Sequence, residues 1–168
     1  MSGLGFEEFV SREQTALLRL AVLLAGDRGH AEDLVQTALL KSYRHWSRVA
    51  GHGDPTAYVR RVLVTTHTSW RRRLSATEQV LETVPDRADP SAPREDDEEL
   101  RTALRALPPR MRTAVVLRFY ADLSEQQAAA AMGCSASTVN TQTARGLARL
   151  RELLAAPPLA PAAREESR

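Results

Sequence analysis

Residues 124–154, SEQQAAAAMGCSASTVNTQTARGLARLRELL, decide the fold of the C-terminal part of this 168-residue chain, because they predict a helix-turn-helix. Ser124 and Gln127 have the spacing of a capping box, so a helix is expected to begin there. Gly133 is expected to end it, since glycine enters the left-handed region without a Cβ clash. Ser135 or Ser137 can cap the second helix.

The second predicted helix has one apolar face and one face suited to DNA. Ala129 lets the two helices cross closely, and Val139 is placed to fill the gap between them. The predicted inner stripe is Val139, Thr143, Leu147, Leu150 and Leu154. The outer face is Ser137, Thr138, Asn140, Thr141, Gln142, Arg145 and Arg149. These donors, acceptors and cations, with no carboxylate among them, suit base edges and phosphates. The alternative is an alanine-rich bundle with a merely solvated polar face.

Two further helices are expected before this motif. Asp96 or Asp97 can cap the first, and Pro108 and Pro109 interrupt the pattern. Pro109 is placed to start the second helix, which would bury Met111, Val115 and Phe119. Residues 75–95 contain prolines and no periodicity, which predicts a flexible linker, and the tail, 155–168, is predicted to be disordered.

The N-terminal part predicts a short helix near Phe6, then a longer one starting after Ser11. Asp27 can cap a further helix that ends near Val49 and turns Tyr43 inward. A second face of that helix mixes an acid, an amide and a leucine, namely Asp33, Gln36 and Leu40. A solvated face with one surface leucine is the alternative interpretation of this face.

A long basic helix is expected after Asp54, with Pro55 at its first position. Its β-branched cluster from Val62 to Thr68 could also suit a strand, but the length and the cap favour a helix. The predicted basic and aromatic surface is Arg60, Arg61, Thr65, His67, Trp70, Arg71, Arg72 and Arg73. Such a surface can hold phosphates and stack on an unpaired base. A core position for Trp70 with solubilising arginines is an equal alternative.

The distribution of charge points to an anionic partner, although the net charge is only +2. Residues 1–74 carry 11 basic and 7 acidic side chains (+4), and residues 101–154 carry 8 and 3 (+5). Residues 75–100, between them, carry 2 basic and 9 acidic side chains (−7). Two basic blocks can therefore face a polyanion separately.

The composition gives no sign of an enzyme, a metal site or a membrane protein. Cys134 is the single cysteine, which excludes an internal disulfide and favours the cytoplasm. No signal peptide or membrane span is recognisable. The four histidines lack metal-ligand spacing, and no phosphate-binding glycine loop or nucleophilic serine is evident. We therefore expect no enzymatic activity, no cofactor and no metal.

Together these segments resemble the extracytoplasmic-function (ECF, group 4) sigma factors of bacterial RNA polymerase, especially the SigE-type subgroup of actinobacteria. The matching segments are FEEFV, LAGDRGHAEDLVQTALLKSYRHW, DPTAYVRRVLV, SWRRR, ALPPRMRTAVVLRFYADLSEQQAAAAMG and CSASTVNTQTARGLARLRE. The resemblance implies an all-α fold of two small domains, sigma region 2 (1–74) and sigma region 4 (96–154), around the flexible linker 75–95.

The resemblance also implies partners and roles. Core RNA polymerase would dock on Asp33, Gln36 and Leu40. The loop and helix from about His52 to Arg73 would open the promoter and read the non-template strand of the minus-ten element. The helix that starts near Ser135 would read the minus-thirty-five element. Promoter DNA and an anti-sigma factor are the further partners, with no membrane insertion.

Two positions depart from the family pattern, in which relatives usually have a basic residue where this chain has Asn140 and often an asparagine where it has Thr65. Both departures concern the promoter sequence that is read. Two other classes fit the residues less well. An autonomous helix-turn-helix regulator would bind a palindrome as a dimer, and a small helical enzyme would need a catalytic site.

Overall fold

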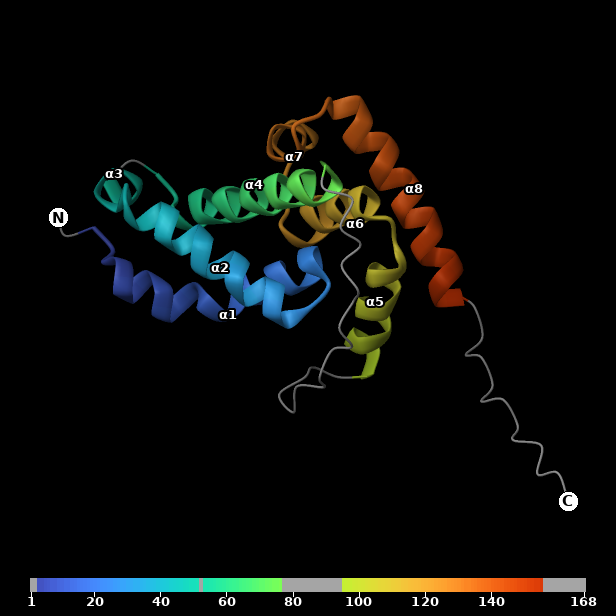
Figure 1. Ribbon diagram of the computed structural model, residues 1–168, viewed down its shortest axis with the longest axis horizontal. Helices are drawn as coiled ribbons and strands as arrows, with labels where there is room; N and C mark the ends of the chain where they lie inside the picture. Colours follow the sequence, from blue (N-terminus) through green and yellow to red (C-terminus); the bar gives the residue numbers. More distant parts are fainter. Residues whose placement is uncertain (1–2, 52, 77–94, 156–168) are drawn as a thin grey trace, which may run out of the picture.

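The structure is a computed structural model that describes residues 3–51, 53–76 and 95–155. Its regular elements in these ranges are all helical, so the expected all-α fold is confirmed (Figure 1). The elements are α1 (Phe6–Ala25), α2 (Arg28–Tyr43), α3 (Trp46–Gly51), α4 (Pro55–Ala76), α5 (Glu95–Ala106), α6 (Pro109–Val115), the π-helical turn η1 (Val116–Tyr120), α7 (Glu125–Met132) and α8 (Ala136–Ala155). The expected linker and tail lie mostly outside the described residues.

Helix α1 is continuous, so the predicted break at Ser11 is wrong. Phe9 is buried on the same stripe as Leu17 and Leu20, and this packing keeps the helix intact through Ser11. The helix ends at Gly26, whose φ of 86° lies in the left-handed region and whose N–H donates to the Val22 carbonyl.

Helix α2 begins as expected at the Asp27 cap but ends six residues before Val49, at Tyr43. The predicted inward position of Tyr43 is wrong, because its side chain is 61% exposed. Its ring packs against Phe6, with centroids 4.9 Å apart. Trp46 is the first residue of the separate helix α3. Its indole N–H donates to the Leu4 carbonyl, and this bond ties the end of α2 to the N-terminal segment.

Helix α4 confirms the choice of helix over strand. The Asp54 side chain accepts a hydrogen bond from the Thr56 N–H at 3.0 Å, and Pro55 takes the first helical position. The hydroxyls of Thr65, Thr66 and Thr68 each donate to the carbonyl four residues earlier. These bonds satisfy the hydroxyls within the helix, so the β-branched cluster does not need a sheet.

The C-terminal helices contain a π-helical turn, η1, that the apolar periodicity of the sequence does not predict. Helix α6 begins at Pro109 as expected, but the predicted burial of Phe119 is wrong, since its side chain is 64% exposed. The chain passes into the π-helical turn η1, which inserts one extra residue per turn and rotates the following side chains around the helix axis. Phe119 therefore points away from the core that Val115 enters.

The two halves of the chain pack against one another. Helix α4 reaches the C-terminal half and contacts α7, while α1 contacts α5 and η1 (Figure 1). Buried apolar side chains of both halves form one continuous cluster. The end of the basic helix α4 consequently lies beside the helix-turn-helix rather than apart from it.

Candidate nucleic-acid interface

The helix-turn-helix forms as its sequence predicts. Ser124 and Gln127 form the complete reciprocal capping box at the start of α7. Gly133 ends α7 with a φ of 67°. The cap of α8 is Ser135, whose hydroxyl accepts from the Thr138 N–H at 3.1 Å. The left-handed Gly133 and the Ser135 cap therefore fix where α8 begins and which side chains its first turn presents.

The inner side of α8 packs on α6 through small residues. Val139 and Thr143 are buried as predicted, and Gly146 is buried between them and Leu150. A Cβ on Gly146 would lie only 2.6 Å from Cγ2 of Val115. The expected inward position of Leu154 is wrong, because it lies at the solvent-facing end of the helix. The close approach at Gly146 sets the angle at which the opposite face is presented.

The opposite face of α8 is open. Two of its predicted DNA-reading residues, Thr138 and Gln142, are half-buried. The other five are exposed, namely Ser137, Asn140, Thr141, Arg145 and Arg149. Arg149 forms an ion pair with Glu152 at 2.9 Å. This pair uses only one of the five N–H donors of the guanidinium, so the others remain available to a phosphate. Arg145, the other cation of this face, forms no ion pair with a carboxylate in the described part of the chain.

The predicted basic surface of α4 divides into two parts. Arg61 and Thr65 are exposed and Arg60 is half-buried, towards the start of the helix. At its other end Arg72 and Arg73 are exposed, Arg71 and Trp70 are half-buried, and Trp70 packs against the apolar cluster. The Arg72 guanidinium donates to the Met132 carbonyl at the end of α7, 3.3 Å away.

His67 differs from the other members of this surface because it is buried, with 5% of its area exposed. Its Nε2 has no hydrogen-bond partner among the described residues. Burial, followed by the positive charges of Arg71 and Arg112, lowers the pKa of His67 from 6.5 to about 4. The imidazole is therefore neutral at pH 7.

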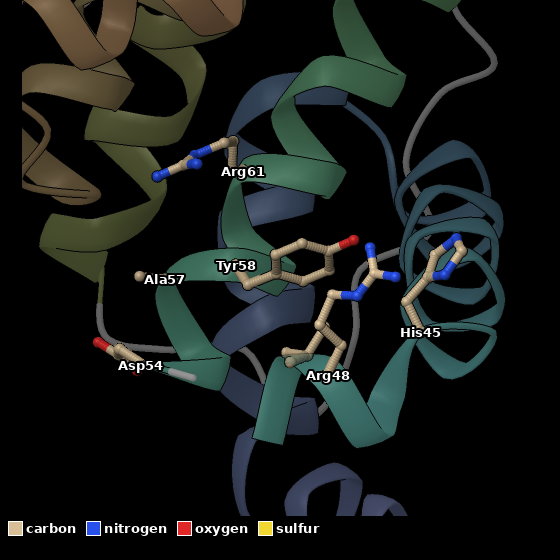
Figure 2. A pocket seen from close by; sticks show the side chains of 8 residues that line it. His45, Arg48, Asp54, Ala57, Tyr58 and Arg61 are labelled. Carbon is tan, nitrogen blue, oxygen red and sulfur yellow. The ribbon is translucent and has the colours of Figure 1, made fainter. Parts of the chain in front are cut away.

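A cavity of about 520 Å³ lies beside the N-terminal end of α4 and was not predicted from the sequence. It is lined by His45, Arg48, Val49, Gly53, Asp54, Ala57, Tyr58 and Arg61. Figure 2 shows the Tyr58 ring directed towards Arg48, with His45 beyond it on the neighbouring segment. Tyr58 lies at an apolar position of the helical spacing of α4, so the sequence gives no signal that its ring borders a cavity.

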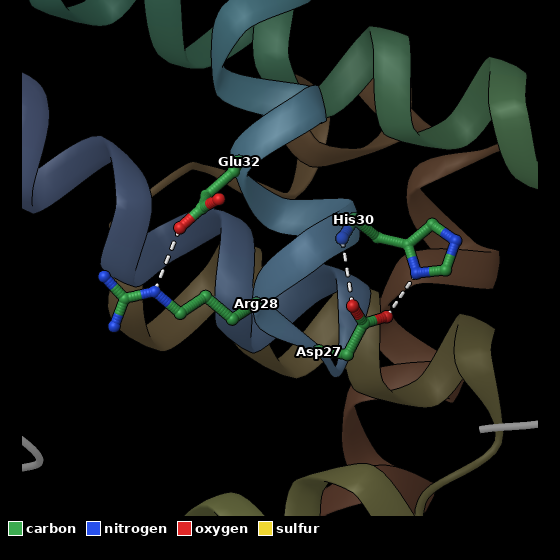
Figure 3. Close-up of polar contacts among 4 residues, drawn as sticks. All are labelled: Asp27, Arg28, His30 and Glu32. Carbon is green, nitrogen blue, oxygen red and sulfur yellow. Dashed lines mark hydrogen bonds and ion pairs between the residues drawn. The ribbon is translucent and has the colours of Figure 1, made fainter. Parts of the chain in front are cut away.

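The predicted polymerase-docking residues share one open face of α2. Asp33, Gln36 and Leu40 are all exposed, Leu40 to 66%. Tyr43, one turn beyond Leu40, extends this face with a second large exposed side chain. The start of the helix is fixed by Asp27, which accepts from the His30 N–H and pairs with its ring, and by the Arg28–Glu32 ion pair (Figure 3).

Comparison with known proteins agrees with this geometry. Residues 9–77 match the family described as sigma-70 region 2, and residues 97–150 match sigma-70 region 4. The RNA polymerase sigma-E factor of Streptomyces avermitilis is 42% identical over 90% of this chain and 86% of its own length. The chain belongs to the extracytoplasmic-function sigma factors of RNA polymerase. Sigma-E factor of Streptomyces coelicolor is 41% identical over 91% of this sigma factor and 88% of its own length.

A solved structure supports the same family. The sigma factor RpoE of Bartonella quintana, in complex with the anti-sigma factor NepR, has a TM-score of 0.68 and 25% identity, over 89% of this chain and 96% of its own. This sigma factor thus directs promoter-specific transcription initiation, with core RNA polymerase and promoter DNA as its partners, and the family is not enzymatic. Helices α1 to α4 form region 2, and α5 to α8 form region 4.

The described residues contain no group of three or more histidine, cysteine, aspartate or glutamate side chains that could hold a metal ion. No helix within the described ranges is long and apolar enough to cross a membrane.

Proposed function

We propose that this sigma factor reads its two promoter elements with two different helices and two different chemistries. In this proposal α8 reads the minus-thirty-five element as duplex DNA, α4 holds the opened minus-ten strand, and α2 docks on core polymerase. The single observation that best supports the division is the exposed face of α8 from Ser137 to Arg145, which presents donors, acceptors and a cation without a carboxylate. This chemistry suits the major groove.

For the minus-thirty-five element, Asn140, Gln142 and Arg145 would contact base edges. Arginine pairs with guanine through two hydrogen bonds, and amide side chains pair with adenine in the same way. Ser137, Thr138, Thr141 and Arg149 would contact phosphates or flanking bases. Because Asn140 replaces the basic residue usual in relatives and is exposed, we expect the element read here to differ from theirs at the contacted base.

For the minus-ten element, an opened strand must be held by cavities, stacking and phosphate contacts, since unpaired bases have no groove. The cavity beside Tyr58 is of a size that holds a small planar ligand, and Arg48 and Arg61 at its border can hold the adjoining phosphates. Thr65 is exposed one turn beyond Arg61 and would face the next base. Capture of such bases stabilises the open promoter without ATP.

Polymerase docking would use the exposed apolar part of the α2 face. Leu40 and Tyr43 would bury their area against the polymerase, while Asp33 and Gln36 at the polar end would set the register. An anti-sigma factor is a further proposed partner, supported by the complex in which the Bartonella quintana relative was solved. A cytoplasmic location, where the polymerase works, follows from these partners.

Run-off transcription tests the proposal. Purified core polymerase would be supplied with or without this sigma factor, on a DNA library in which both promoter elements are randomised. We expect transcripts only with the sigma factor, enriched in two motifs at a fixed spacing. Transcripts enriched in a downstream motif alone would contradict the role of α8.

We predict that Arg145→Ala lowers discrimination between the preferred and a substituted minus-thirty-five base by about 1 to 3 kcal/mol, because it removes a bidentate base contact. Binding to core polymerase should stay unchanged. The measurement is competitive run-off transcription from two templates that differ at one upstream base pair. Arg151→Ala, on the same helix outside the reading face, is the matched control, and equal discrimination in the two variants would refute the assignment.

We predict that Leu40→Ala combined with Asp33→Ala weakens binding to core polymerase roughly tenfold, since it removes about 1.4 kcal/mol of buried contact from the α2 face. Both side chains are exposed in the free protein, so the fold should be unaffected. Fluorescence titration with labelled sigma factor measures the affinity. Glu8→Ala on α1 is the control for loss of an exposed carboxylate. If the double variant binds core polymerase with the affinity of the wild type, the α2 face is not part of the interface.

A further inference from the structure

A second cavity, which we call the interdomain crevice, lies where region 2 meets region 4. It has a volume of about 420 Å³. Its walls come from α4 on one side and from α6 and α7 on the other. The lining residues are His67, Thr68, Arg71, Arg72, Pro109, Arg110, Thr113 and Met132. Neither domain alone would form this site.

The interdomain crevice is strongly positive. Arg71, Arg72 and Arg110 line it, and Arg112 is buried close enough to Arg71 and His67 for their charges to interact. None of these four arginines forms an ion pair with a carboxylate in the part of the chain that the structure describes. Burial, together with the charges of Arg71 and Arg105, lowers the pKa of Arg112 to about 10, so Arg112 stays charged at neutral pH.

Two buried nitrogens in this region also lack hydrogen-bond partners. His67 Nε2 and Arg112 Nε have none among the described residues, and each residue is at least nine-tenths buried. Arg112 receives partial compensation because its Nη1 lies near Gly26, at the negative C-terminal end of α1. Arg71 is half-buried and forms no ion pair among the described residues, whereas Arg110 is exposed to solvent. Uncompensated charge in a half-buried site is unfavourable, and an anion would remove this penalty.

We propose that the interdomain crevice is a binding site for a phosphate-class oxyanion, held by Arg71 and Arg72 from region 2 and Arg110 from region 4. Guanidinium groups match the oxygens of such an anion through paired hydrogen bonds. The imidazole of His67, which lines the same cavity, offers a further unpaired nitrogen. The hydroxyls of Thr68 and Thr113 each donate to a helix carbonyl, so they can only accept from a protonated oxyanion.

A small free oxyanion fits this site better than a nucleic-acid strand. The crevice is walled by both domains, and Arg72 bridges it through its bond to the Met132 carbonyl. Its volume of about 420 Å³ accommodates phosphate or pyrophosphate. Because the anion would contact both domains, its binding should also hold region 2 against region 4, independently of which bases the sigma factor reads.

Isothermal titration calorimetry of the full chain with sodium phosphate and sodium pyrophosphate tests the proposal, in buffer whose ionic strength is matched with chloride. We expect one saturable site, and a Kd that rises roughly tenfold in Arg71→Gln and in Arg110→Gln, as for loss of about 1.4 kcal/mol of charge-assisted hydrogen bonding. Arg110 is exposed, so its removal leaves the fold intact. Arg12→Gln, which removes an exposed arginine of α1, is the matched control with an unchanged Kd.

Two results would overturn the proposal. The first is the absence of saturable binding of either anion. The second is binding that Arg71→Gln and Arg110→Gln leave unchanged, which would locate the anion elsewhere. A parallel titration with a short oligothymidylate separates the two sources of phosphate, because binding of the oligonucleotide but not of pyrophosphate would also reject a site for a free oxyanion.

Discussion

Lowering the pH from 7.5 to 4 should destabilise the wild-type protein by about 3 kcal/mol more than it destabilises His67→Gln. The pKa of His67 falls from 6.5 to about 4 on folding, chiefly through burial and then through Arg71 and Arg112. Between these two values the unfolded chain binds a proton that the folded chain does not. Stability is therefore lost as the pH falls through this window, and above pH 6.5 the imidazole is neutral in both states and contributes nothing.

The measurement is urea unfolding followed by circular dichroism at several pH values from 4 to 7.5, for the wild type and the variant. His45→Gln is the matched control, because it removes an exposed imidazole from region 2. Carboxylates that titrate in the same range affect all three proteins equally, so the difference isolates His67. Equal pH dependence of wild type and His67→Gln would contradict the burial of a neutral imidazole between the domains.

Gly146→Leu should lower the free energy of unfolding by about 3 kcal/mol, at the upper end of the usual effect of overpacking. The glycine lies where α8 crosses α6, and a Cβ there would come within 2.6 Å of Cγ2 of Val115 and 3.3 Å of the Met111 carbonyl oxygen. Valine is β-branched and has few alternative rotamers, and the carbonyl belongs to the backbone, so neither can move aside easily.

Gly146→Ala is a more stringent test of the same contact, because helix propensity and the contact with Val115 have opposite effects on stability. Helix propensity alone would stabilise the protein by about 1 kcal/mol, because alanine replaces glycine within a helix. We expect the contact with Val115 to outweigh this gain, so that Gly146→Ala is also destabilising, by less than the leucine variant. Ala148 is exposed on the same helix, so Ala148→Leu is the control and should change the free energy of unfolding little. A stabilised alanine variant in thermal unfolding would show that α8 and α6 separate at little cost.

The sequence by itself determined the features that depend on neighbouring residues. The caps at Asp27, Asp54 and Ser124 and the left-handed glycine at Gly133 were all predicted and all form, because each involves a bond or a backbone angle within a few residues. The motifs along the chain likewise indicate the sigma-factor family without knowledge of the fold. The residues assigned to DNA and polymerase remain predictions that the proposed experiments test.

Only the tertiary structure decided how these elements meet. The π-helical turn η1 changes the register of a single helix, and Phe119 points outward for that reason, which no regular periodicity encodes. The burial of His67 and Arg112 requires region 4 to pack on the end of α4, a contact between residues far apart in the sequence. A local pattern specifies what each helix can present, whereas packing between distant segments fixes which of those side chains meet solvent.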